Sequence, residues 1–220
     1  MKLKFTIINY STYIKSHELM ECFKLLSSKY RKLNTTIYIF KSNKQFICFL
    51  LKKFRLIQFL QQIISPVIDK LTKSESSAFY NVLKKEIYVF EDKAMTYCDK
   101  GINGLYLSES YKVYGKYLKD TDLLKAKEMW IKYIILDILI HEMTHALQHT
   151  EKRLSTPITR IFKKWENLNE EKEAVTASIK AFKKNHDKFC EILNVKGIKI
   201  KHTIDPIRIN YKYTIYVKKH

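Results

Sequence analysis

Glycine and proline are scarce in this sequence, and its cysteines form no close pair. Only 4 glycines and 3 prolines occur among 220 residues, and the chain has no internal repeat or low-complexity tract. The cysteines stand far apart, at Cys22, Cys48, Cys98 and Cys190. This spacing excludes the CxxC pairs of zinc knuckles and redox motifs. We therefore expect separate thiols, although their even number also permits two disulfides.

The sequence also lacks a secretory signal and a hydrophobic run suited to crossing a membrane. Residues 1–10 have neither the apolar core nor the cleavage site of a signal peptide, so we expect a cytoplasmic protein. The most apolar stretch, residues 46–64, is broken by Lys52, Lys53 and Arg55, which makes it unsuitable as a transmembrane segment. It predicts a core helix with a basic outer face. A helix lying in a membrane interface is the alternative.

What the chain has in excess is positive charge. Its 41 Lys and Arg outnumber 22 Asp and Glu, for a net charge of +19, so acidic partners are favoured. Nucleic acid, an anionic membrane face or an acidic protein substrate would fit, and nonspecific nucleic acid binding needs no dedicated site. A genome of low GC content would produce the same bias without selection for binding. With 46% hydrophobic and 29% charged residues, the composition indicates one globular domain.

The N-terminal third of the chain predicts alternating strands and helices. Residues 4–10 and 35–40 are typical of strands, and residues 16–33 have the apolar spacing of a helix. Together they predict a β-α-β opening. Beyond the apolar helix at 46–64, Ser65-Pro66 is typical of the start of another short helix.

The middle of the chain predicts a hairpin followed by one long helix. Residues 78–82 and 86–90 are β-rich and close together, and residues 105–107 predict a further short strand. Thr121-Asp122 can cap a helix that runs to Gln148. Because this helix is apolar on nearly all sides from Tyr133 to Ile140, it must be surrounded by protein.

The end of that helix carries an HExxH motif, His141-Glu142-Met143-Thr144-His145. Residues four apart lie on one face of a helix, so both imidazoles can bind the same ion. Glu142 lies one step round the helix. There it can reach a zinc-bound water, take its proton during attack on a peptide carbonyl and return it to the leaving amine.

A catalytic zinc site needs a third protein ligand, and three glutamates on the next predicted helix compete for that role. The apolar face of this helix is formed by Ala174, Ala177, Ser178, Ala181 and Phe182. Glu171 projects close to the centre of that face, Glu170 lies at its edge, and Glu173 lies on the opposite, solvated face. A carboxylate that points into an apolar interface needs a cation or metal partner, so we predict Glu171 as the ligand.

Two other polar residues lie close to the motif on the same helix. His149 continues the histidine stripe but lies roughly 12 Å along the axis from His141, too far to share one ion. We expect it at the rim of the site. Asp137, one turn before His141, either orients a ligand or is a satisfied buried polar group. The positions at which metzincins have a glycine and a third histidine hold Gln148 and Glu151, which excludes that class.

HExxH followed by Glu171-Lys172-Glu173-Ala174 resembles the gluzincin arrangement, in which ExxA lies on a second helix. Thermolysin-like, CaaX-prenyl-protease-like and ImmA/IrrE-type peptidases share it. The resemblance covers residues 78–185. Those families often have Asp or Asn directly after the alanine or serine, where this chain has Val175.

The resemblance also implies an edge strand beside the metal, along which an extended substrate pairs its backbone. Residues 105–107 or 86–90 are the candidates for this strand. A donor near the metal would stabilise the transition state. The sequence leaves four candidates for the donor, namely Tyr106, His202, Tyr211 and Tyr213.

We therefore predict an α+β zincin-like metalloprotease domain with a buried HExxH helix, a second ligand helix and a small β-sheet. The single domain would comprise an N-terminal α/β segment (1–77), a metallopeptidase core (78–185) and a C-terminal extension (186–220). One Zn²⁺ per chain would be held by His141, His145 and Glu171. Glu142 would be the general base for hydrolysis of a protein or peptide substrate.

Two alternatives stay open. His145-Ala146-Leu147-Gln148 also resembles SprT-like DNA-repair proteases, and basic clusters such as Lys183-Lys184 favour a nucleic-acid-associated protease. Those proteases have a third histidine beyond the motif, whereas no histidine lies between His149 and His186. The second alternative is an inactive zincin that serves as a binding module, although the intact Glu142 argues against it.

Overall fold

The computed structural model of the chain describes residues 4–53, 77–96, 120–154, 169–195, 198–204 and 211–217. The helices and strands, in chain order, are β1 (Thr6–Asn9), α1 (Ser16–Lys24), α2 (Ser28–Arg31), β2 (Thr36–Phe40), α3 (Asn43–Lys53), β3 (Ala78–Asn81), β4 (Glu86–Phe90), α7 (Asp120–Thr150), α9 (Asn169–Ile192), β5 (Ile198–Ile204) and β6 (Tyr211–Val217). The predicted α+β class is confirmed.

A mixed sheet of four strands has the order β1-β2-β4-β3. β1 and β2 pair in parallel, with Thr6 opposite Thr36, which confirms the predicted β-α-β opening. β2 also pairs in parallel with β4. β3 and β4 form the predicted antiparallel hairpin, with Ala78 opposite Val89. Because β4 has a partner on each side, the prediction that residues 86–90 could serve as a free edge strand is wrong, and β3 occupies the edge of the described sheet.

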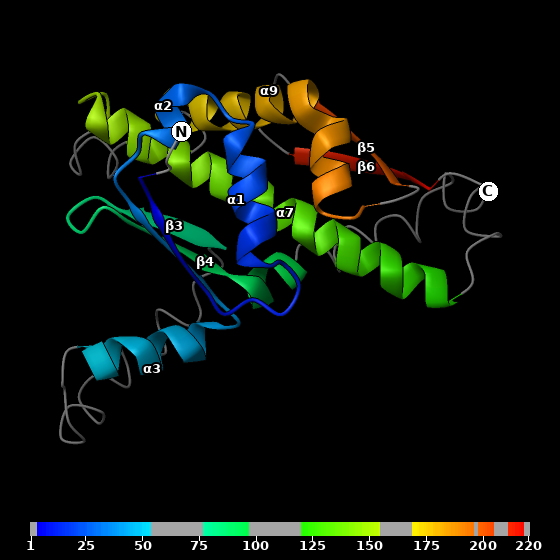
Figure 1. Cartoon of the computed structure of the whole chain (residues 1–220), viewed down its shortest axis with the longest axis horizontal. Coiled ribbons are helices and arrows are strands. Elements are labelled where there is room, and N and C mark those ends of the chain that lie inside the picture. The colour runs from blue at the N-terminus through cyan, green and yellow to red at the C-terminus, as the bar shows by residue number, and fades with distance from the viewer. Residues whose placement is uncertain are drawn as a thin grey trace.

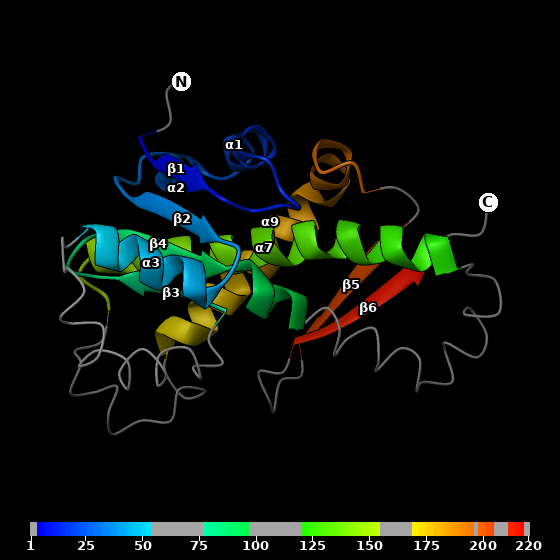
Figure 2. The ribbon, with the colours of Figure 1, turned by 90° about the horizontal axis from the view of Figure 1, so that it is seen from below.

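The two faces of the sheet carry different side chains, because successive residues of a strand point to opposite faces. Ile37, Ile39, Ile87 and Val89 belong to the main core, which also includes side chains of α1, α7 and α9. The alternate residues form an aromatic cluster with Phe46 of α3, namely Tyr38, Phe40, Tyr88 and Phe90. Figures 1 and 2 show α3 on one side of the sheet and α7 on the other.

Helix α7 lies between the sheet and α9, and it contacts β3, β4 and α9. Trp130, Tyr133, Leu136 and Leu139 are buried along it, as the apolar run predicted. α9 begins at Asn169 and packs along α7, so the second predicted helix is also confirmed. Among the helices of the described residues, none has both the length and the hydrophobicity to span a bilayer.

The single helix predicted over residues 16–33 is wrong, because the structure has two. α1 ends at Lys24, where the backbone N–H of Leu25 bonds to the carbonyl of Cys22 and that of Leu26 bonds to the carbonyl of Phe23. Ser27 is extended and precedes α2. Serine favours helix starts over helix interiors, and Ser27-Ser28 lies at the start of α2. Leu26 and Leu33 flank α2, and both are buried in the core.

Several predictions fall outside the described residues. They are the continuation of the apolar helix over 54–64, the short helix opening at Ser65 and the strand at 105–107, together with Tyr106. Within the C-terminal extension, β5 and β6 form an antiparallel pair that the sequence patterns did not predict. Two of the candidate donors, His202 and Tyr213, are directly opposite each other in this pair.

Candidate metal centre

The packing of α9 on α7 brings His141, His145 and Glu171 together. The Nε2 atoms of the two histidines are 3.1 Å apart. Glu171 Oε2 lies 3.3 Å from His141 Nε2 and 3.2 Å from His145 Nε2. These side chains form the one cluster in the described part of the chain in which at least three His, Cys, Asp or Glu residues could hold a metal ion.

The triangle formed by these three atoms has the size that a zinc ion requires. Zinc binds nitrogen and oxygen at about 2.0–2.1 Å, so a tetrahedral ion separates its ligand atoms by roughly 3.3 Å. The measured edges of 3.1, 3.2 and 3.3 Å are close to that value. Two imidazoles and one carboxylate are also a donor set that zinc uses in catalytic sites. The residues therefore fit the ion that the motif implies.

The electrostatics of the cluster favour a cation at its centre. Burial opposes the negative charge of Glu171, yet hydrogen bonds with His141 and His145 outweigh burial and lower the pKa of Glu171 to about 2. Burial acts to lower the pKa of His145, but the hydrogen bond with Glu171 and the charge of Glu142 outweigh it and raise that pKa. Glu171 thus stays negatively charged although its side chain is only 7% exposed.

Glu142 lies beside the cluster and is itself buried. Burial raises the pKa of its carboxyl, while the neighbouring charges of His141 and His145 act in the opposite direction. The backbone of Tyr80 in β3 also acts to lower this pKa. Glu142 therefore lies between the helix that carries it and strand β3.

Strand β3 lies beside the same region. Phe90 donates a backbone hydrogen bond to the carbonyl of Ser77, so Ser77 and Phe90 are a hydrogen-bonded pair of the antiparallel ladder. Hydrogen-bonded and non-hydrogen-bonded pairs alternate along such a ladder. The N–H and C=O groups of Ala78 and Tyr80 accordingly point away from β4, which agrees with the contact between Tyr80 and Glu142.

The three competing glutamates have different surroundings. Glu171 joins the histidines, while Glu170 is also buried but lies outside the cluster. Glu173 has a side chain that is 45% exposed, and it pairs with Arg153 at 2.6 Å. Its solvated position agrees with the sequence-based expectation.

The remaining polar residues of α7 contact other groups. Asp137 accepts a hydrogen bond from Ser178 of α9, which links the two helices inside the core. His149 Nδ1 lies 2.9 Å from the hydroxyl of Tyr80, between the end of α7 and the edge strand. Both contacts depend on the docking of a second element, so no local pattern in the sequence could have identified the partners.

Gln148 is a contact of the cluster that the sequence patterns missed. It is fully buried, and its Oε1 lies 2.9 Å from His145 Nδ1. Its Nε2 donates to the backbone carbonyl of Glu170 at 2.9 Å and to Glu173 Oε2 at 3.1 Å. The only available signal was its position three residues after His145, on the same side of the helix.

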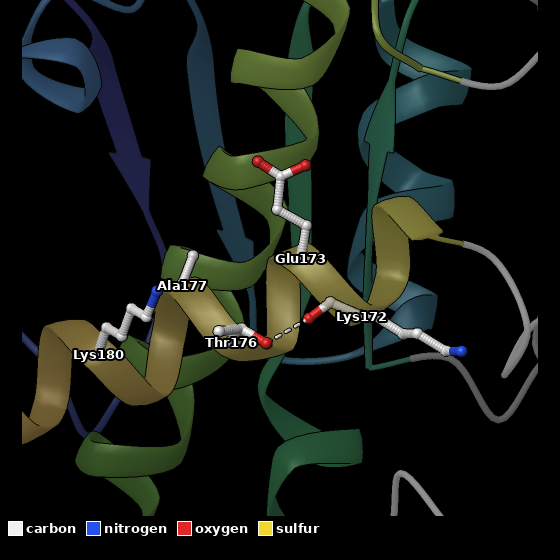
Figure 3. Close-up of a pocket in the computed structure, with 5 residues that line it drawn as sticks. All are labelled: Lys172, Glu173, Thr176, Ala177 and Lys180. Atoms are coloured by element: carbon white, nitrogen blue, oxygen red, sulfur yellow. Dashed lines mark hydrogen bonds between the residues drawn. The ribbon is translucent and has the colours of Figure 1, made fainter.

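A shallow hollow lies on the outer side of α9 (Figure 3). It is lined by Lys172, Glu173, Thr176, Ala177 and Lys180. At 100° per residue these positions lie on the side of the helix opposite to Glu171. The hollow is therefore separate from the cluster of His141, His145 and Glu171, and its lining carries two lysines and one glutamate.

We found no match to this chain among known protein families, curated proteins or solved structures.

Proposed function

We propose that this protein is a zinc-dependent metallopeptidase of the gluzincin type with a zincin-like fold. The observation that carries the proposal is the triangle of His141 Nε2, His145 Nε2 and Glu171 Oε2, with edges of 3.1 to 3.3 Å. Ligand spacing, donor type and burial all suit one zinc ion per chain. Glu142, the proposed general base, directly follows His141 in the sequence and lies close enough to His141 and His145 for their charges to act on its carboxyl.

The residues have distinct roles in the proposed reaction. His141, His145 and Glu171 hold the ion, which when bound supplies a Lewis acid and makes a water molecule acidic enough to act as a nucleophile near neutral pH. Glu142 takes the proton of the attacking water and delivers it to the leaving amine. Its buried position and raised pKa suit a group that must hold a proton between these two steps.

The motif and its general base support a peptide as the substrate class. HExxH with a glutamate on a second helix resembles the arrangement of gluzincin peptidases. Glu142 also lies beside strand β3, whose Tyr80 backbone acts on the Glu142 carboxyl. We therefore propose a peptide or protein as the substrate.

Zinc stoichiometry in the purified protein tests the proposal directly. We expect one zinc per metal-replete wild-type chain, and its loss in His141→Ala and Glu171→Ala because two ligands hold the ion poorly. Glu142→Gln should keep the metal. Glu170→Ala and Glu173→Ala test the two other candidate ligands and should both keep the metal. If one of them loses zinc while Glu171→Ala keeps it, the third ligand is that residue and not Glu171. Wild-type protein that takes up no zinc would exclude a metallopeptidase.

A second candidate function is binding of nucleic acid by a protease recruited through its basic surface. Exposed lysines follow the outer side of α9, namely Lys172, Lys180, Lys183, Lys184 and Lys188. Two of them line the hollow in Figure 3. Rows of lysine on one helix face can contact successive phosphates, with an affinity that falls as salt rises.

Salt-dependent binding to duplex DNA tests this candidate. If α9 is the contact, Lys180→Glu/Lys183→Glu/Lys184→Glu should lower the slope of log affinity against log salt by about one per lysine that touches phosphate. Lys15→Glu/Lys32→Glu/Lys41→Glu is the control, since it changes the net charge equally at exposed positions away from α9. An equal decrease of the slope in the two variants would show that DNA binding depends on the net charge and not on α9.

A further inference from the structure

Gln148 occupies a buried position between the metal-binding cluster and the first turn of α9. Its side chain is 0% exposed. A primary amide has one acceptor and one donor end, and burial without partners would cost about 1–3 kcal/mol for each unsatisfied group. In this structure both ends have partners, one on α7 and two on α9.

The partners of the amide determine its orientation. The backbone carbonyl of Glu170 can only accept a hydrogen bond, and the Glu173 carboxylate, which is paired with Arg153, also accepts. The NH₂ group of Gln148 must therefore face α9. Its oxygen must face His145, and the Nδ1 atom 2.9 Å away must be the donor.

We propose that Gln148 is the positioning residue that holds His145 in the tautomer protonated at Nδ1. This inference rests on the proposed zinc site, because a neutral imidazole with its proton on Nδ1 presents the lone pair of Nε2, the atom that faces His141 and Glu171. Hydrogen bonds from the distal nitrogen of a ligating histidine fix ring orientation and raise ligand basicity.

The same side chain links both halves of the site. Gln148 bonds to the carbonyl of Glu170, the residue directly before the ligand Glu171. One amide therefore fixes the ring of a ligand on α7 and the backbone next to a ligand on α9. A change at Gln148 should disturb the spacing of the ligands as well as the tautomer of His145.

Three variants separate this role from a general contribution to folding. Gln148→Leu keeps the bulk and removes all three hydrogen bonds of the amide. Gln148→Glu keeps an acceptor for His145 Nδ1. Tyr133→Phe is the matched control, because it removes a buried hydroxyl on the same helix that contacts His186 and not the cluster.

Zinc affinity would be measured by competition with a chelator. We expect it to be about 10–100-fold weaker in Gln148→Leu than in the wild type. The zinc affinity of Tyr133→Phe should be unchanged, and Gln148→Glu should bind zinc more tightly than Gln148→Leu. Nitrogen NMR of the zinc-loaded wild type should show that the His145 ring is bound through Nε2 and carries its proton on Nδ1. Zinc bound through Nδ1, or a folded Gln148→Leu protein with wild-type zinc affinity, would overturn the inference. Wild-type protein that takes up no zinc would overturn the proposed function, and this inference with it.

Discussion

At the scale of single residues, Glu142 is the group whose loss should separate metal binding from chemistry. It lies beside the cluster without being one of the three ligands. We expect Glu142→Gln to retain zinc and to lose about 10²–10⁴-fold in kcat on a labelled unfolded protein, the usual contribution of a general base. Glu128→Gln, at an exposed position on the same helix, should keep full activity.

The outcome that would contradict this role is equally specific. Retained turnover in Glu142→Gln, with zinc at full occupancy, would show that another group moves the proton. Loss of both zinc and turnover would indicate a structural contribution, through its contact with the backbone of Tyr80.

The candidate site could be predicted from the sequence only as far as local spacing allows. His141 and His145 follow from helical periodicity, and Glu171 follows from its position on the apolar face of the next helix. Gln148 could not be found in this way, because two of its partners belong to α9 and are brought to it by the docking of the two helices.

At the scale of elements, Lys132 joins three helical segments. Its Nζ lies 2.5 Å from Glu18 Oε1 of α1 and donates to the carbonyl of Leu193 just beyond α9. The two side chains of the ion pair are only 19% and 9% exposed. We expect Lys132→Met to lower the free energy of unfolding by about 3 kcal/mol, since it leaves the Glu18 charge buried without this partner.

Urea denaturation would measure this effect. Lys24→Met is the matched control, because Lys24 also pairs with a glutamate of α1 but both side chains are about half exposed, at 54% and 51%. Lys24→Met should lower the free energy of unfolding by less than about 1 kcal/mol. The double variant Lys132→Met/Glu18→Met should be more stable than Lys132→Met alone. If Lys132→Met and Lys24→Met had the same free energy of unfolding, the ion pair between Lys132 and Glu18 would contribute no more than an exposed pair, which would contradict the prediction.

The elements with strong periodicity were predictable, and their arrangement was not. Residues 37–40 and 87–90 alternate between aliphatic and aromatic side chains, which a sequence shows directly. Among the described strands, the position of β4 inside the sheet depends on pairing between residues about 50 positions apart, such as Ile37 and Ile87. The break after Lys24 lies just before the Ser27-Ser28 pair at the start of α2, which the apolar spacing alone does not reveal.

At the scale of the whole molecule, zinc should stabilise the folded chain. The three ligands come from two helices, so the site exists only when α7 and α9 are docked. Free zinc at 100 times its dissociation constant should add about 2.7 kcal/mol, which corresponds to a rise of about 5–10 °C in Tm for a chain of this size. Differential scanning fluorimetry of wild type and Glu171→Ala measures it. A Tm independent of zinc in the wild type would contradict the site.

The excess of positive charge also has a consequence for how copies of the chain behave toward one another. Strand pairing between two copies of a protein is a general route to aggregation. The net charge of +19 opposes such an encounter, because every copy repels the next. Screening by salt weakens that repulsion beyond about 8 Å at physiological ionic strength. The chain should therefore self-associate more readily as the salt concentration rises.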